Sequence, residues 1–317
     1  MLSLLLFFTA MPALASSGEM FAEIFAPPGA TQRTRARYEY RHYGEESLTL
    51  RQSKGELSVP VSKGDGRSWR ASASADYDDI ATKERFPNGR QMPNRLWDVG
   101  AGVSHQRILE DGKAAGGTFT LNSPSDRPFG RGRDLGFNLN LNYKIPEENE
   151  SAWILFVSLS NTRGFLNYIP MLGAAYAFKA SEKLRMVVGL PFVIAFWMPS
   201  EVVTVAATYF PVRNAELRVG IGPRRGLSGY ILTNFRSRSF RLSDRTDSDE
   251  RLHNEEGLAQ AGLNIPLLGP ALTLETGGGW SFARRYYLAS GFGGRKDAPR
   301  IMPGSVGFGF AKLVAAL

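Results

Sequence analysis

The chain of 317 residues contains no cysteine and only three histidines. The lack of cysteine excludes a disulfide framework and any metal site that uses thiolate ligands. It also lets the chain pass through an oxidising compartment without cross-linking, which is compatible with export. His42, His105 and His253 leave few candidates for a general base.

Long apolar runs are also scarce. Beyond the first residues, no stretch reaches the roughly 18 consecutive apolar residues that a membrane-spanning helix requires. The nearest candidate, residues 186–200, contains Pro191 and Pro199, and proline interrupts a helix. We therefore do not expect a helical inner-membrane protein.

The first residues predict a targeting segment. Leu2 to Ala15 is apolar and ends in Ala13-Leu14-Ala15, a small-x-small site followed by polar residues. We predict a cleaved signal peptide over residues 1–15 and a flexible leader over residues 16–34. No Lys or Arg precedes the apolar run, which a start codon further upstream would explain. A buried N-terminal helix is the alternative.

The chain is rich in glycine, aromatics and positive charge. Its 34 Gly, 20 Phe and 11 Tyr suit many strands and turns with aromatic packing. The net charge of +8, from 38 Lys and Arg against 30 Asp and Glu, indicates anionic lipid, nucleic acid or an anion-lined cavity. Because no helix-turn-helix, zinc-finger or aromatic RNA-binding motif is present, nucleic acid is disfavoured. We favour contact with lipopolysaccharide phosphates and a basic lumen.

The sequence alternates with a period of two. Between residues 135 and 143 the odd positions carry Leu, Phe, Leu, Leu and Tyr, whereas the even positions carry Gly and Asn. Between Trp69 and Tyr77 an apolar face likewise begins and ends with an aromatic residue. Successive side chains of a strand point to opposite faces, so this pattern predicts strands and not helices.

A soluble sandwich and a membrane barrel both show such alternation. The polar positions here are mainly Gly, Ser, Asn and Thr, which suit a crowded wet lumen. Several apolar faces span about nine or ten residues and are bounded by aromatics, as bilayer-crossing strands require. Hydrocarbon offers no hydrogen-bond partner, so the sheet must close. We predict an all-β fold, a transmembrane antiparallel up-and-down β-barrel over residues 35–317 in a bacterial outer membrane.

The candidate strands are numerous and separated by turn-like clusters of Gly, Pro, Asn and Asp. Single-chain bacterial barrels have even strand numbers, so we predict about 12 strands, with about 14 as the alternative. The candidates are residues 35–43, 46–61, 66–78, 95–107, 115–122, 132–144, 151–163, 166–179, 183–197, 200–212, 214–223, 228–242, 255–267, 270–284 and 303–314.

Aromatic residues close to the ends of the apolar faces are candidates for the membrane interface. They are Trp69, Tyr77, Trp97, Tyr143, Tyr168, Phe178, Trp280 and Phe282.

Arginines recur across neighbouring candidate strands in the second half of the chain. They predict an anion-selective lining or lipopolysaccharide contacts, because Arg pairs bidentately with phosphate and carboxylate. The alternative is charge pairing with loop Asp and Glu. These arginines are Arg218, Arg224, Arg225, Arg236, Arg238, Arg241, Arg284 and Arg285.

The second half of the chain contains four short motifs: Glu182-Lys183-Leu184, Gly189 to Phe192, Tyr209-Phe210-Pro211 and Arg284-Arg285-Tyr286. In these motifs it resembles an uncharacterised family of bacterial outer-membrane β-barrels that is classed as a domain of unknown function. The resemblance implies a barrel inserted by the outer-membrane assembly machinery, and it assigns no substrate. The chain ends Ala315-Ala316-Leu317 and so departs from the terminal aromatic residue common in such barrels.

No pattern of catalytic residues is present. There is no Gly-x-Ser-x-Gly motif, and Gly277-Gly278-Gly279 lacks the Lys and Ser/Thr of a phosphate-binding loop. Carboxylates at Asp244, Asp247, Asp249 and Glu250 suit a solvated loop better than a calcium site. We therefore expect no enzyme, no cofactor and no metal.

Three functions remain open. The leading hypothesis is a porin-like passive channel or transporter for small solutes. The first alternative is a structural or adhesive barrel plugged by its own side chains, because a barrel of about 12 strands leaves little free lumen. The second alternative is a barrel-embedded lipid hydrolase. The oligomeric state and the solute are left open.

Overall fold

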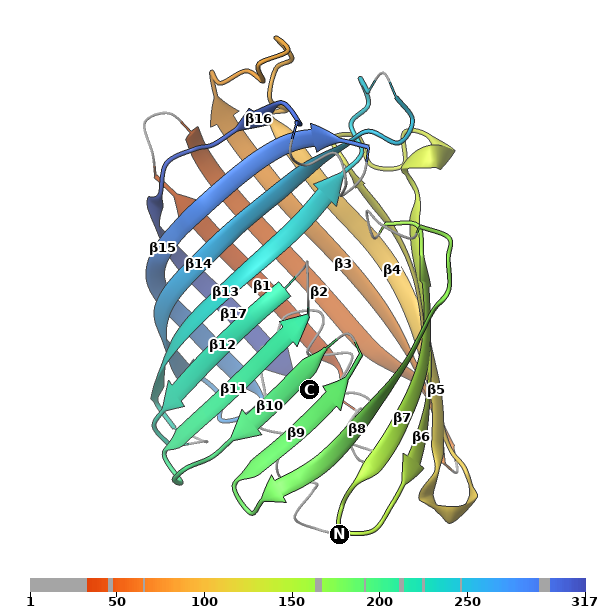
Figure 1. Cartoon of the computed structure of the whole chain (residues 1–317). Helices are drawn as coiled ribbons and strands as arrows, with labels where there is room; N and C mark the ends of the chain where they lie inside the picture. The colour runs from red at the N-terminus through yellow and green to blue at the C-terminus, as the bar shows by residue number, and fades with distance from the viewer. Residues whose placement is uncertain are drawn as a thin grey trace.

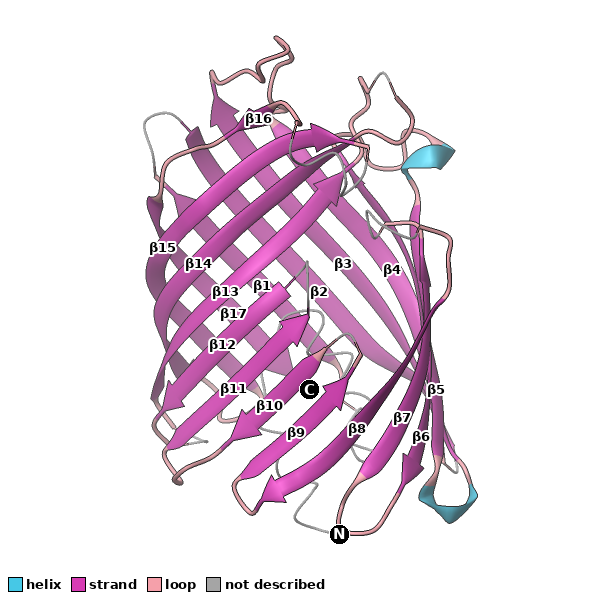
Figure 2. Ribbon diagram, viewed as in Figure 1, coloured by secondary structure: helices cyan, strands magenta, loops and turns pink. Residues whose placement is uncertain are grey.

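The alternating segments form the strands of one antiparallel sheet in the computed structural model (Figures 1 and 2). The structure describes residues 33–44, 48–64, 66–162, 167–190, 192–210, 214–223, 226–245, 247–290 and 297–317. The predicted signal peptide and nearly all of the predicted leader lie outside these residues.

The strands follow one another along the chain and pair mostly with their sequence neighbours. The first nine are β1 (Arg35–Tyr43), β2 (Leu48–Gly64), β3 (Arg67–Thr82), β4 (Arg95–Ile108), β5 (Ala114–Ser125), β6 (Gly136–Pro146), β7 (Ala152–Ser160), β8 (Met171–Ser181) and β9 (Leu184–Gly189). The others are β10 (Val193–Trp197), β11 (Val203–Phe210), β12 (Asn214–Ile221), β13 (Ser228–Phe240), β14 (Arg251–Pro266), β15 (Leu272–Ala289), β16 (Arg300–Ile301) and β17 (Val306–Ala316).

The sheet closes on itself because β1 pairs with both β2 and β17. Strands β1 to β15 pair in sequence order, and β17 joins β15 to β1, which gives fifteen plus one, or 16, wall strands. The two-residue β16 pairs with β15 at Tyr286 and Tyr287 and adds no wall strand. The closed antiparallel barrel is thus confirmed, whereas the prediction of about 12 or 14 strands is wrong.

The error in the strand number has an identifiable source. The candidate at residues 183–197 is two strands, β9 and β10, joined by a turn in which Gly189 and Phe192 exchange backbone hydrogen bonds of 2.9 Å. The other fourteen candidates each match one wall strand, so the fifteen candidates together correspond to 16 wall strands. A smaller correction concerns Tyr168, which precedes β8 and lies in a loop with φ 64°.

Two short 3₁₀ turns, η1 (Glu110–Gly112) and η2 (Gly132–Asp134), lie in connections between strands. Within the described ranges, no helix is long and apolar enough to cross a membrane.

Side chains alternate between the two faces of the wall as the sequence predicts. On β3, Arg70 and Asp78 point inward and are buried, whereas Trp69 points outward and is 44% exposed. Outward side chains on other strands are also apolar and exposed, among them Leu57, Phe119, Leu121, Leu141, Leu155, Val188, Tyr209 and Leu217. The outer surface of the barrel is therefore an apolar belt.

The two ends of the barrel differ. One end, here called the turn end, carries short connections such as residues 147–151 and 182–183. It also holds Thr34 and Leu317, whose backbones exchange hydrogen bonds of 2.8 and 2.9 Å. The opposite end, here called the loop end, carries the long connections at residues 83–94, 126–135, 241–250 and 290–305. Barrels of bacterial outer membranes place long loops outside the cell.

The wall is tall on one side and low on the other (Figure 1). Strands β2 to β5 and β13 to β15 have 12 to 18 residues, whereas β9 to β12 have six, five, eight and eight. We call β9 to β12 the low wall. At the loop end β9 and β10 are joined by only residues 190–192, and β11 and β12 by only residues 211–213, so the chain itself limits the height of this wall.

The closing seam is testable by substitution in β17, which pairs with a strand on each side. Ala311 faces outward opposite Tyr40 of β1 and Thr276 of β15. Ala311→Pro removes a ladder N–H, and an unpaired backbone group in hydrocarbon costs several kcal/mol. We expect severalfold less of the folded, heat-modifiable band on gels of unboiled protein, while Ala311→Ser stays close to wild type. Equal folding of both variants would contradict the closed seam.

Candidate functional site

At the loop end the ring of strands becomes smaller. Above Arg236 the strand β13 has no partner in β12 and instead meets β5, where the Arg241 N–H donates to the carbonyl of Pro124 at 2.8 Å and Ser125 forms a parallel bridge with Arg241. The loop-end halves of β1 to β5, β13 to β15 and β17 therefore form a narrower ring, which we call the neck.

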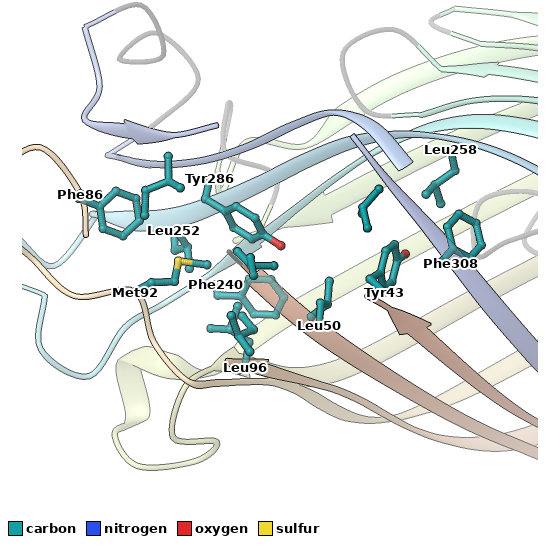
Figure 3. Packing of buried hydrophobic residues seen from close by; sticks show 14 of the residues in the cluster. Tyr43, Leu50, Phe86, Met92, Leu96, Phe240, Leu252, Leu258, Tyr286 and Phe308 are labelled. Atoms are coloured by element: carbon teal, nitrogen blue, oxygen red, sulfur yellow. The ribbon is translucent and has the colours of Figure 1, made fainter. Parts of the chain in front are cut away.

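Apolar side chains fill the neck (Figure 3). Phe240, Leu252 and Tyr286, from β13, β14 and β15, belong to the same buried cluster as side chains of β2, β3 and β4. Each is at most 4% exposed. The members from the facing wall and the loop that follows it are Leu48, Leu50, Ile80, Phe86, Met92 and Leu96. The axial path at the loop end is thus occupied by packed side chains.

Toward the turn end from this cluster, charged side chains reach across the lumen. Arg236 of β13 donates to Gln52 Oε1 at 2.8 Å and to the Tyr43 hydroxyl at 3.4 Å. Arg238 pairs with Asp78 of β3, although five strands separate β13 from β3 in the sheet. Glu256 accepts from Arg236 at 2.6 Å. These contacts join opposite walls of the neck and replace water with protein groups.

A second group of ion pairs lies nearer the turn end. Glu275 of β15, 1% exposed, binds Lys312 at 3.2 Å and lies 3.6 Å from Arg218. On β1 and β2, Glu56 binds Arg37 at 3.0 Å and Lys54 at 2.8 Å. Each of these two carboxylates therefore lies beside two inward cations, and buried Glu275 has the charged partners that a buried charge requires.

The inner surface is free of packed side chains along the middle of β3 to β5. Ser72 and Ser74 point inward and are exposed, although their neighbours Arg70 and Asp78 on the same face are buried. On the adjacent strand β4, Gly102 is paired with Ser72 and has no room for a side chain. A Cβ at Gly102 would lie 2.9 Å from Ser72 Oγ and 2.6 Å from a Thr120 methyl. Space large enough for solvent therefore borders a smooth polar surface, which we call the polar wall.

The inner surface of β7 to β10, together with the loop end of β11, is mainly apolar instead. Ile154, Ala175, Ala177, Val187 and Phe192 form one buried cluster, against which Phe156, Ile194 and Phe210 pack. Ile154 and Phe156 share the inward parity of β7 with Ser158, whose hydroxyl donates to Asn140 at 2.6 Å. The outward positions of the same strands carry exposed Trp153, Leu155, Leu172, Val188, Trp197 and Tyr209. This part of the sheet is therefore apolar on both faces.

The predicted arginines do not form one site. Arg218, Arg236, Arg238 and Arg284 point inward. Arg284 is 2% exposed, with its guanidinium 5.8 Å from the centre of the Tyr43 ring. A bulge at Ala283, φ 51°, turns Arg285 outward, opposite Glu255. Arg241 donates to the carbonyls of Leu135 and Asn161, and Arg224 and Arg225 lie outside the described residues. Their contact with anions or lipopolysaccharide stays a prediction.

The predicted interface aromatics lie toward both ends of the outer surface. Trp69, Tyr143 and Phe178 are each within three residues of the turn end of their strands. Tyr77 and Trp97 lie toward the loop end, with ring centres 4.1 Å apart. Trp280 and Phe282 are outward on β15 and are 54% and 39% exposed. Their role at a membrane interface stays a prediction.

The loops above the neck are tied to one another. Arg90, in the loop between β3 and β4, pairs with Asp244 and Glu250 of the loop between β13 and β14. Arg245 of the latter loop binds buried Asp134 at 2.8 Å. The hydrogen bond from Arg90 holds the pKa of Asp244 below its ordinary value. The carboxylates that the sequence offered as a solvated cluster are thus partly loop contacts.

Two of the three histidines, His105 and His253, lie in aromatic contacts. His105 stacks on Trp69 at 4.2 Å, and His253 stacks on Tyr287 at 4.8 Å. Across the described ranges, no three His, Asp or Glu side chains come together in a group that could hold a metal ion. The sequence analysis did not identify Asp78, Glu256 and Glu275 as candidate site residues. The alternation of polar and apolar residues in their strands is the signal that could have placed them on the inward face.

Comparison with known proteins assigns no family. No protein-family profile matches the chain, and no curated protein matches it. Among solved structures, an outer membrane channel from Pseudomonas putida F1 is 12% identical, with 92% of this chain and 100% of that chain covered and a TM-score of 0.39. A mutant of the TodX monoaromatic hydrocarbon channel is 9% identical, with 93% of each chain covered and a TM-score of 0.36. Acinetobacter baumannii outer membrane protein Omp33 is 8% identical, with 89% and 98% covered and a TM-score of 0.32. The resemblance to an uncharacterised barrel family stays a prediction.

The pair of Arg238 and Asp78 supports a stability test. Arg238→Leu leaves Asp78, 2% exposed, as a buried carboxylate without its main partner. Breaking a buried ion pair on one side costs about 3 kcal/mol or more, whereas removing both charges restores much of the loss. We expect urea unfolding in detergent, followed by tryptophan fluorescence, to show this loss for Arg238→Leu and a recovery in Arg238→Leu/Asp78→Leu. Asp79→Asn, next in sequence and outward, is the control and should change little. A double variant as unstable as the single one would contradict the cross-lumen pair.

The loop contact of Arg90 should depend on pH. Because the pKa of Asp244 in the folded chain is lowered by Arg90, the contact is complete above the ordinary pKa of aspartate and is lost as pH falls through the lowered value. We expect a nitroxide on Ser248→Cys, the only thiol in the chain, to be restrained at pH 7 and to gain mobility below about pH 4. Arg90→Gln should give the mobile spectrum already at pH 7, and Lys83→Gln should not. A spectrum insensitive to both pH and Arg90→Gln would show that the loops are held otherwise.

Proposed function

We propose that the chain is an outer-membrane β-barrel that acts as a passive channel or transporter for small solutes. The observation that carries this proposal is the polar wall, where Ser72 and Ser74 point inward and are exposed inside a closed ring of 16 strands. Barrels of about 16 strands leave an aqueous space that smaller barrels fill with side chains. A barrel of 16 strands therefore favours a channel more strongly than the predicted barrel of about 12 or 14 strands.

A membrane location is supported by the outer surface. Exposed Leu, Val, Phe and Trp side chains on nearly every strand would be costly in water, and monomeric soluble proteins rarely expose apolar patches of more than a few hundred Å². Closure of the sheet satisfies the backbone in hydrocarbon. We further propose export with cleavage after Ala15, insertion by the outer-membrane assembly machinery and contact with lipopolysaccharide, without nucleic acid as a partner.

The lumen that we propose is only partly basic. Arg218, Arg236 and Arg238 lie beside inward carboxylates, so their charges are largely balanced. Lys144 faces the lumen from β6, and no ion pair of the described residues includes it. A weak preference for anions follows from this cation.

The packed neck favours a second candidate, a structural or adhesive barrel whose loops are the working surface. The apolar cluster and the contacts of Arg236 and Arg238 would serve as its plug. We propose no enzymatic activity and no cofactor.

Solute flux separates the two candidates. We expect proteoliposomes containing the wild-type chain to swell in arabinose, and Ser74→Arg to slow swelling severalfold because its side chain projects from the polar wall into the open space. Ser74→Ala should match the wild type. Comparable amounts of the folded, heat-modifiable form would be confirmed for each. A folded wild-type chain with no flux and no ion current in planar bilayers would remove the channel and leave the plugged barrel.

A further inference from the structure

We infer that small apolar solutes cross the wall of this barrel sideways, over the low wall and between the lumen and the surrounding lipid, and do not follow the axis through the neck. This inference rests on the proposed channel function and names its route and its solute class. It depends on the height of the low wall, on the break in the ladder above it, on the apolar surfaces on either side of that break and on the filled neck.

The low wall is too short to span a bilayer. Strand β10 has five residues, which at about 3.3 Å each and a tilt of about 45° cover only about 12 Å of thickness. The apolar band of outer-membrane barrels is about 25 Å tall. Because the connections at the loop end are three residues each, the chain between β9 and β12 cannot supply the missing height.

Above the low wall, between Arg236 and the contact of Arg241 with β5, β13 has no strand partner on its β12 side among the described residues. The ladder between β12 and β13 ends at Asn214 and Arg236, whereas β13 continues to Phe240 and pairs there only with β14 among the described strands. Unpaired backbone groups at membrane depth are tolerated where they line a passage and not where they meet lipid. Ser237 and Ser239, on the outward parity of this segment, add polar groups to the same edge.

The surface on either side of this gap in the ladder is apolar. Outside, Leu172 is 79% and Val188 is 43% exposed, and at the rim Leu190 is 82% exposed. Inside, Phe192, Ile194 and Phe210 join the cluster on the inner surface. Among the described residues at the loop-end rim of the low wall, an apolar molecule would therefore meet no charged side chain between the lipid and the lumen. Arg185 lies at the turn end of β9, where it binds Glu150. Inward Glu216 and Arg218, on β12, lie farther from the rim than Asn214.

The alternative axial route is obstructed. The neck holds an apolar cluster whose largest members, Tyr43, Tyr286, Phe86 and Phe240, are fully buried. The contacts of Arg236 with Gln52 and of Arg238 with Asp78 cross the lumen beneath it. The solute class follows from this arrangement: small apolar molecules that partition into lipid and can pass a gap a few residues high.

The test uses entry of N-phenyl-1-naphthylamine, an apolar dye that fluoresces in lipid, into intact cells with an undisturbed lipopolysaccharide layer. Leu190→Glu places a charge on the rim, and we expect severalfold slower dye entry. Leu227→Glu is the matched control, because Leu227 is 60% exposed in the turn between β12 and β13 at the other end of the barrel. It should leave dye entry unchanged.

A second pair of variants separates the two inner surfaces. Ile194→Lys puts a charge on the apolar inner surface, so it should slow dye entry while arabinose flux is retained. Ile194→Val should preserve both dye entry and arabinose flux. Ser74→Arg on the polar wall should slow arabinose and leave the dye unaffected. Heat-modifiable migration would establish that every variant is folded.

The outcomes are distinct. Arabinose flux with no dye entry, or equal effects of Leu190→Glu and Leu227→Glu, would overturn the lateral route and leave the channel intact. No flux of either compound through folded wild-type protein would overturn the channel itself. Dye entry that Leu190→Glu and Ile194→Lys reduce and Ser74→Arg does not would support the lateral route.

Discussion

Every strand of this barrel depends on a neighbour for its backbone hydrogen bonds, and β1 supplies the last of them by pairing with β2 on one side and β17 on the other. Closure sets the circumference at 16 strands, more than side chains alone can fill. A closed end can then arise only if the ring itself becomes smaller. The departure of β13 from β12 to reach β5 achieves this, and the neck and the low wall are two results of the same departure.

The charges within the neck determine which walls meet. Arg236 and Arg238 reach β2 and β3, which are separated from β13 by four and five strands of the sheet, and Glu256 and Asp78 balance their charges. Buried ion pairs of this kind contribute little net stability, because the desolvation of both charges offsets their attraction. They do penalise any arrangement in which one partner is left alone. The cross-lumen contacts therefore specify the geometry of the neck more than they strengthen it.

Much of the wall could be predicted from alternation. The candidate at residues 35–43 coincides with β1, and the one at residues 228–242 differs from β13 by two residues. The arginines of β13 were identified as functional candidates, but their partners were not. Asp78 and Arg238 are 160 residues apart in the sequence, and a pattern within one segment cannot predict a contact between residues so far apart. The bulge at Ala283 was equally hidden, and it reverses the faces that simple parity assigns to Arg284 and Arg285.

Alternation did not separate β9 from β10, the first two strands of the low wall, and this has a physical cause. Apolar side chains occupy both parities over residues 183–197, so no change of face marks the turn after Gly189. In an ordinary barrel wall the inward parity would be polar, and the break would have been visible. An apolar inner surface makes less favourable contact with water than a polar one. Natural sequences depart from a local rule, here the polar inward face of a barrel strand, mainly at functional sites. The apolar inward side chains of β9 and β10 are therefore the sequence feature that agrees with the proposed lateral route, in which an apolar molecule and not water contacts this surface.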